Sequence, residues 1–184
     1  MESLLKELVF LSCDALKEED HYLRESLSNN QCYSCDKTGI LSINNERYYQ
    51  FIIARYLFRH FSRRIQVEYD LIDLVVFRED LPSKVEVAVE MKRWMSSTGS
   101  PEIPGIRSDF DKLRKCDSLK TLVLIFSSNP KNVSIKGNIQ YLSNKIDRDL
   151  DPDLWVYESF DTVGGNGAEN VFWVAGYDPF SHSK

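Results

Sequence analysis

The chain is poor in the residues that interrupt a compact fold, and it has no long hydrophobic run. Eight glycines and six prolines among 184 residues leave no room for a long low-complexity or disordered segment. The apolar run Leu122 to Phe126 is far shorter than the roughly 20 residues that span a bilayer. The first residues lack a basic start, an apolar core and a cleavage site. We therefore expect a cytoplasmic protein without a secretion signal or a membrane partner.

Cysteine and histidine are too sparse to support a zinc site. The chain has four cysteines and three histidines, and only Cys32 and Cys35 have the spacing of half a zinc knuckle. Cys13 and Cys116 are isolated in the sequence, so a second pair of ligands is missing. We expect reduced thiols without a special role, as is usual in a cytoplasmic chain.

An overall excess of positive charge is also absent. The net charge of −5 argues against a protein that coats nucleic acid through bulk electrostatics. The acidic residues gather at the ends: residues 1–31 hold seven acids and three bases, and 147–184 hold eight acids and two bases. By contrast, 47–64 hold five arginines and no acid, and 92–115 hold six Lys or Arg and three acids. The basic segments are either solvated helix faces or contacts for an anionic ligand. The acidic first helix could mask a site, form a homodimer or bind a partner protein.

Hydrophobic periodicity predicts an α/β protein of one domain, 1–184, with one mixed sheet flanked by helices. The expected helices cover 2–27, 44–62, a segment starting at Ser108, and 138–149. The expected strands cover 65–77, which could be split in two, 85–91, 121–126, 154–160 and 171–177. A turn is expected from Arg78 to Lys84, and a loop from Ser96 to Arg107.

The predicted helix at 44–62 has two chemically different sides. Asn44 or Asn45 is the expected N-cap, and Glu46 lies in the first turn. A rotation of about 100° per residue groups the arginines on one side and places Glu46 and Gln50 on the other, with large apolar residues. We expect Glu46 to point toward the sheet, although the helix dipole alone also favours an acid at this position.

A strict alternation marks the strand at 85–91. One side carries Val85, Val87, Val89 and Met91, and the other carries Glu86, Ala88, Glu90 and Lys92. Glu90 and Lys92 therefore share a face, with Cα atoms about 7 Å apart. Burying either charge costs several kcal/mol unless it is paired or bound to a metal. The pair indicates either a metal site or a strand that faces solvent at the sheet edge.

Asp73 favours the metal site. It lies in an apolar strand joined by a short turn to the strand of Glu90, and neighbouring strands are about 4.8 Å apart, so the two carboxylates can share a cation. Carboxylates are ligands that Mg²⁺ prefers, and Lys92 could hold a nucleophilic water or neutralise charge on a phosphate. Asp70 is the main competitor, because a β-bulge would exchange the two strand faces. Glu86 lies about 13 Å from Glu90 along the strand.

The run of Asp73 followed by Glu90-Met91-Lys92, on a hairpin between two helices, resembles the PD-(D/E)XK nuclease superfamily. The resemblance covers 44–127 and implies the restriction-endonuclease-like αβββαβ core. It leaves 1–43 as an N-terminal helical extension and 128–184 as a C-terminal α/β completion. Ile72 replaces the proline that the family has before the aspartate.

The resemblance also implies a reaction and the residues for it. In the family, the positions matched by Asp73 and Glu90 bind Mg²⁺ or Mn²⁺, and the position matched by Lys92 assists the nucleophilic water. Met91 would add its backbone carbonyl to the metal shell, and Glu46 matches a glutamate that often joins it. The implied activity is metal-dependent hydrolysis of DNA. A nuclease acting on RNA and an inactive nuclease-fold subunit that binds or assembles remain alternatives.

Basic residues near the motif are candidates for contacts with nucleic acid. Those expected to neutralise phosphates are Arg93, Arg107, Lys112, Arg114 and Lys115. Trp94 could stack on a base or fill the core. The loop expected after it suits a segment that contacts substrate.

Overall fold

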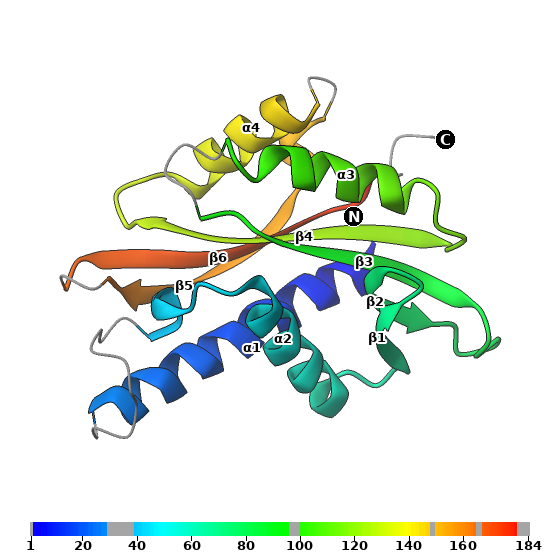
Figure 1. The fold of residues 1–184 in the computed structure, drawn as a ribbon, viewed down its shortest axis with the longest axis horizontal. Coiled ribbons are helices and arrows are strands. Elements are labelled where there is room, and N and C mark those ends of the chain that lie inside the picture. Colours follow the sequence, from blue (N-terminus) through cyan, green and yellow to red (C-terminus); the bar gives the residue numbers. More distant parts are fainter. Residues whose placement is uncertain (1, 29–38, 96–99, 148–149, 165–166, 180–184) are drawn as a thin grey trace.

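A computed structural model describes residues 2–28, 39–95, 100–147, 150–164 and 167–179 (Figure 1). Its strands are β1 (Ile65–Tyr69), β2 (Ile72–Phe77), β3 (Val85–Arg93), β4 (Lys120–Pro130), β5 (Val156–Val163) and β6 (Glu169–Tyr177). Its helices are α1 (Ser3–Ser28), α2 (Glu46–His60), α3 (Ile103–Leu113) and α4 (Ile135–Ile146), with short 3-10 turns η1 (Gly39–Ser42) and η2 (Pro152–Leu154). The strands form one sheet in the order β1-β2-β3-β4-β6-β5. Strands β3 and β4 pair in parallel and the other pairs are antiparallel, which confirms the expected mixed sheet.

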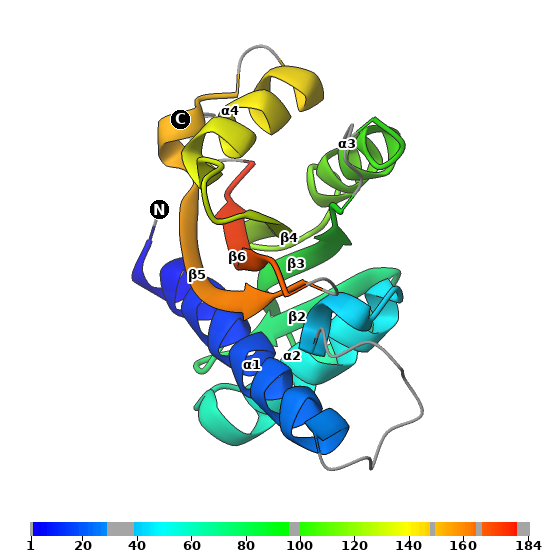
Figure 2. The ribbon, with the colours of Figure 1, turned by 90° about the vertical axis from the view of Figure 1, so that its left-hand side faces the viewer.

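Helices cover both faces of the sheet. Figures 1 and 2 show α1 and α2 on one face and α3 and α4 on the other. Because side chains alternate along a strand, β2 sends Leu74 and Val76 into the core beneath α1 and α2, and Val75 and Phe77 into the core beneath α3 and α4. No helix in the described ranges is long and apolar enough to span a lipid bilayer.

Helix α1 is anchored by its buried acids as well as by its apolar side. Asp20 is 4% exposed and accepts hydrogen bonds from the Ile40 amide (3.0 Å) and the Thr162 hydroxyl (2.9 Å). Gly39 has a φ of +54°, and a Cβ there would lie 2.3 Å from Asp20 Oδ1, so only glycine fits. Glu19 is also buried and pairs with Arg55 at 3.1 Å. These two acids of α1 are therefore bound within the chain.

The predicted strand at 65–77 is split by a two-residue turn. Asp70 and Leu71 have φ values of +49° and +68°, and Tyr69 pairs with Ile72 across the turn. Two consecutive left-handed residues are the geometry of a type I′ hairpin. Asp70 consequently lies exposed in the turn, while Asp73 lies within β2.

Several predicted boundaries are wrong, and α3 differs most. It begins at Ile103 rather than Ser108, with Pro104 in its first turn, where a missing N–H costs nothing. The expected loop is therefore shorter; residues 96–99 lie outside the described residues. Helix α4 begins at Ile135 because Ser134 caps it, and Leu154 belongs to η2 rather than to β5.

The other helices and strands lie close to their predicted positions. Asn45 is the N-cap of α2 and accepts from the Arg47 amide, which decides between the two expected caps. The alternation in β3 holds from Val87 to Met91, but Val85 packs beneath α3 and α4 because the β2–β3 register shifts near Phe77. Among the cysteines, Cys32 and Cys35 lie outside the described residues.

Candidate active site

The candidate site lies where β3 extends beyond its pairing with β2. The last paired residues are Leu74 and Val89, so Met91 has no strand partner on this side. Its amide donates instead to Asp73 Oδ2 (2.8 Å), and its carbonyl accepts from Gln50 Nε2 (3.5 Å). The side chains of Asp73 (β2) and Gln50 (α2) thus bind the Met91 backbone groups that a neighbouring strand would otherwise pair with.

Glu90 and Asp73 form a carboxyl pair on the α3 side of the sheet. Glu90 is 2% exposed, and the two carboxyl groups are hydrogen-bonding neighbours. Burial raises the pKa of Glu90 to about 7, helped by the charge of Asp73 and opposed by Lys112. Burial also raises the pKa of Asp73, although the Met91 amide opposes the rise. The pair therefore favours binding a proton or a cation.

Lys112 of α3 supplies a positive charge to this pair. Its ammonium lies 2.6 Å from Glu90 Oε1 and also donates to the Leu71 carbonyl at 2.5 Å. Of the basic residues expected to contact nucleic acid, Lys112 is the one whose hydrogen bond reaches the carboxyl pair within the described part of the chain.

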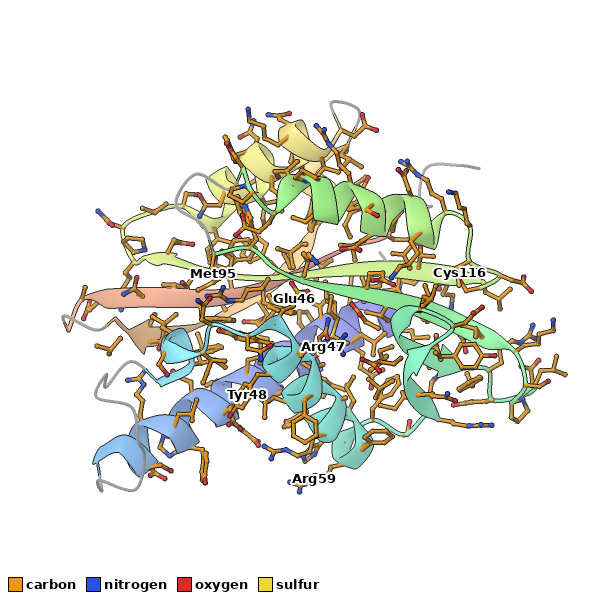
Figure 3. All side chains as sticks on the ribbon, viewed as in Figure 1. Glu46, Arg47, Tyr48, Arg59, Met95 and Cys116 are labelled. Carbon is orange, nitrogen blue, oxygen red and sulfur yellow. The ribbon has the colours of Figure 1, made fainter. Side chains whose placement is uncertain are left out.

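Glu46 orients Lys92. One Glu46 oxygen lies 3.1 Å from Lys92 Nζ, and the other accepts from the Arg93 amide at 2.9 Å. Figure 3 shows Glu46 at the end of α2 that faces β3. Burial lowers the pKa of Lys92, but Glu46, Asp109 and Asp73 outweigh it and leave that pKa raised. Lys92 is therefore a protonated, fixed ammonium beside the carboxyl pair.

Asp109 completes the cluster and was not identified from the sequence. Burial raises its pKa to about 6, while Lys92 and Lys112 oppose the rise and Asp73 and Glu46 add to it. The helix expected from Ser108 already held Asp109 and Lys112 one turn apart, but nothing in the sequence showed that this side of the helix faces Lys92. Once α3 begins at Ile103, Gly105, Asp109 and Lys112 follow at helical spacing on one side. A Cβ at Gly105 would lie 3.2 Å from Lys92 Cε, so the glycine makes room for the lysine.

Three of the other basic candidates make side-chain contacts outside the carboxyl pair. Arg107 donates to the carbonyls of Lys145 and Ile146 at the end of α4, and Arg114 pairs with Asp111. Arg93 donates to Asn44 through Nη1 (2.8 Å). Its Nε is buried without a hydrogen-bond partner in the described structure.

Trp94 is 6% exposed and packs against Trp173, with ring centroids 6.0 Å apart. This placement supports the interpretation of Trp94 as a core residue. Base stacking would require an exposed ring face, and little of Trp94 is exposed.

The chemistry of the cluster fits a hard divalent cation. The carboxylates of Asp73 and Glu90 lie together, and the Met91 amide contacts Asp73. Mg²⁺ is commonly bound by one or two carboxylates with water completing its shell. Within the described ranges, no three His, Cys, Asp or Glu side chains are arranged to hold a metal ion by themselves. Both oxygens of Glu46 are engaged by Lys92 and Arg93, so here Glu46 acts on the lysine.

Comparison of the chain with protein-family models, with curated proteins and with solved structures gives no match.

Proposed function

We propose that this chain is a metal-dependent nuclease that hydrolyses phosphodiester bonds in DNA. The observation that carries the proposal is the carboxyl pair of buried Glu90 and half-buried Asp73, with the ammonium of Lys92 beside it. The order α2-β1-β2-β3-α3-β4 agrees with the αβββαβ order of a restriction-endonuclease-like core and supports the same proposal.

Asp73, Glu90 and the Met91 carbonyl would hold Mg²⁺ or Mn²⁺. A bound divalent cation supplies Lewis acidity and a bound water of lowered pKa. The carboxyl pair favours such an ion because burial opposes the negative charge of both groups and raises both pKa values, and the charge of Asp73 adds to the rise for Glu90. Lys112 neutralises Glu90 in this structure, so the Lys112 ammonium must move away from Glu90 when the ion binds.

Lys92 would act on the substrate as a charge and not as a base. Its raised pKa keeps the ammonium protonated at neutral pH. It can therefore hold the attacking water or stabilise the negative charge that develops on the phosphate. Glu46 is a positioning residue, because its contacts fix the Lys92 ammonium and the backbone beside it.

The test is cleavage of plasmid, linear and single-stranded DNA, and of RNA, with Mg²⁺ or Mn²⁺. Wild type is compared with Lys92→Ala and Asp73→Asn, and with Lys136→Ala as a control at an exposed lysine of α4. We expect a loss of at least about a hundredfold in kcat for the first two, in the range of removing one transition-state contact. Equal activity in wild type and Lys92→Ala, or none in either across all substrates and metals, would overturn the proposal.

An inactive nuclease-fold subunit is the second candidate, and the Lys112–Glu90 ion pair favours it. A tethered ammonium 2.6 Å from Glu90 already neutralises the carboxylate that a metal would need. The melting temperature in Mg²⁺ separates the two candidates, because an ion that binds the folded state raises it. A melting temperature that does not respond to Mg²⁺ or Mn²⁺ in wild type or Lys112→Ala supports the inactive subunit.

A further inference from the structure

The outer side of α2 carries an open groove, and Asp73, Glu90 and Lys92 are not among the residues that line it. The groove has a volume of about 470 Å³ between α2 and β1. Phe51 and Phe58 line it and are 61% and 62% exposed, while Ala54 and Val67 form apolar wall beneath them. Two large rings facing water from one groove are unfavourable unless a ligand covers them.

Arginines alternate with these rings along the helix. Arg47, Arg55 and Arg59 line the groove, against one acid, Glu68. Arg47 pairs with Glu68 at 2.5 Å, and Arg55 lies over the Phe51 ring at 5.8 Å. Arg59 forms no ion pair within the described residues. The groove therefore offers positive charge and aromatic faces together, although the chain as a whole is acidic.

The groove adjoins the candidate active site. Gln50 lines the groove and also donates to the Met91 carbonyl, which belongs to the proposed metal shell. Arg47 follows Glu46 directly, and Figure 3 shows both at one end of α2, with Arg59 at the other end. A ligand lying along α2 would therefore have one end beside Lys92 and the carboxyl pair.

We propose that this groove binds a single-stranded segment of nucleic acid, with bases stacked on Phe51 and Phe58 and phosphates near the arginines. Aromatic platforms interleaved with cationic side chains are the means by which proteins bind single strands without sequence preference. An acidic peptide would match the charge, but it offers no bases to stack on the exposed rings of Phe51 and Phe58. The identification of this strand as substrate rests on the proposed nuclease function; its binding does not.

Binding is measured in EDTA, without metal, by fluorescence anisotropy of a labelled single-stranded DNA oligonucleotide of mixed sequence. Wild type is compared with Phe51→Ala/Phe58→Ala, and with Phe10→Ala as a control at a Phe on α1 that is 41% exposed. We expect the double substitution to raise Kd at least about tenfold, because it removes both rings on which bases would stack. Phe10→Ala should bind like wild type, and a duplex of the same sequence should bind more weakly.

A second substitution tests the phosphate contacts. Arg59→Gln should reduce the slope of log K against log salt by about 0.7, the value for one phosphate contact on a single strand. Arg78→Gln, at an arginine paired with Asp80 after β2, should leave the slope unchanged. Unchanged urea midpoints would show that all variants fold.

Three results would overturn the inference. They are no single-strand binding by wild type, equal affinity of wild type and the phenylalanine variant, and binding of a labelled acidic amphipathic peptide in place of the oligonucleotide. Because no metal is present, loss of binding is distinguishable from failure of the nuclease proposal, which would leave binding intact and abolish only cleavage.

Discussion

Replacing Glu90 with glutamine should remove a loss of stability that wild type undergoes as pH rises toward neutrality. Glu90 is buried beside Asp73, and its pKa in the folded state is about 7, against 4.5 for an ordinary glutamate. The folded state therefore holds the Glu90 proton more tightly than the unfolded chain does. The unfolding free energy of wild type consequently falls as pH rises from about 4.5 to about 7. Glutamine has nearly the same shape but no proton to lose, so this fall is absent from the variant.

The size of the effect follows from the two pKa values. One unit of pKa difference corresponds to about 1.36 kcal/mol, so the rise from 4.5 to about 7 corresponds to about 3 kcal/mol. This is an upper value, because the pKa of Asp73 is also raised and its carboxyl shares the change with Glu90. Across the same pH range, the stability of Glu90→Gln relative to wild type should increase by up to about 3 kcal/mol.

Urea unfolding from about pH 4 to pH 8 measures this difference, read from midpoints at unchanged m. Glu158→Gln, at an exposed glutamate of β5, is the matched control and should parallel wild type. Saturating Mg²⁺ should stabilise wild type at pH 8 but not Glu90→Gln, because the variant lacks one of the proposed ligands. Parallel pH curves for wild type and Glu90→Gln would refute the reasoning, since they would show that Glu90 ionises in the folded state as it does in the unfolded chain.

Three further substitutions test the packing by urea unfolding. Asp20→Ala should cost about 2–4 kcal/mol, since it leaves a buried amide and a hydroxyl without their acceptor; an unchanged midpoint would contradict the anchoring role of this acid. Gly176→Ala should cost at least about 1–3 kcal/mol, because its Cβ would lie 2.4 Å from Val9 Cγ2; a neutral effect would mean that α1 can shift away from β6. Trp173→Phe should cost about 1–2 kcal/mol through the lost 2.7 Å hydrogen bond to Asn129, and a smaller loss would indicate that water replaces the indole.

The residues that define the candidate site could be predicted where local periodicity decides their placement. Alternation along β3 put Glu90 and Lys92 on one face, and they do lie together on the α3 side. Helical spacing in α2 likewise predicted that Glu46 points toward the sheet, and Glu46 does contact Lys92 there.

The rest depends on contacts between distant parts of the chain or on unusual backbone. The turn uses two left-handed residues, Asp70 and Leu71, and leucine rarely adopts this backbone, so Asp70 alone is a weak signal of its position. Pro104 and Gly105 suggested a loop, which moved the expected start of α3 and left Gly105 outside the helix that carries Asp109 and Lys112. Arg107 appeared suited to phosphate, but its partners are carbonyls of α4, which only the tertiary packing of α3 against α4 reveals.

The carboxyl pair and the Lys112 ammonium belong to parts of the chain that come together at different stages of folding. Asp73 and Met91, whose contact holds the carboxyl pair, are 18 residues apart on neighbouring antiparallel strands. Lys112 lies 22 residues beyond Glu90, and β4 can pair with β3 only after the crossover through α3. Hairpins close faster than parallel pairs joined by a crossover, because shorter loops cost less entropy. The carboxyl pair should therefore form before its lysine arrives, and we expect divalent cations in solution to speed refolding by neutralising the hairpin during that interval.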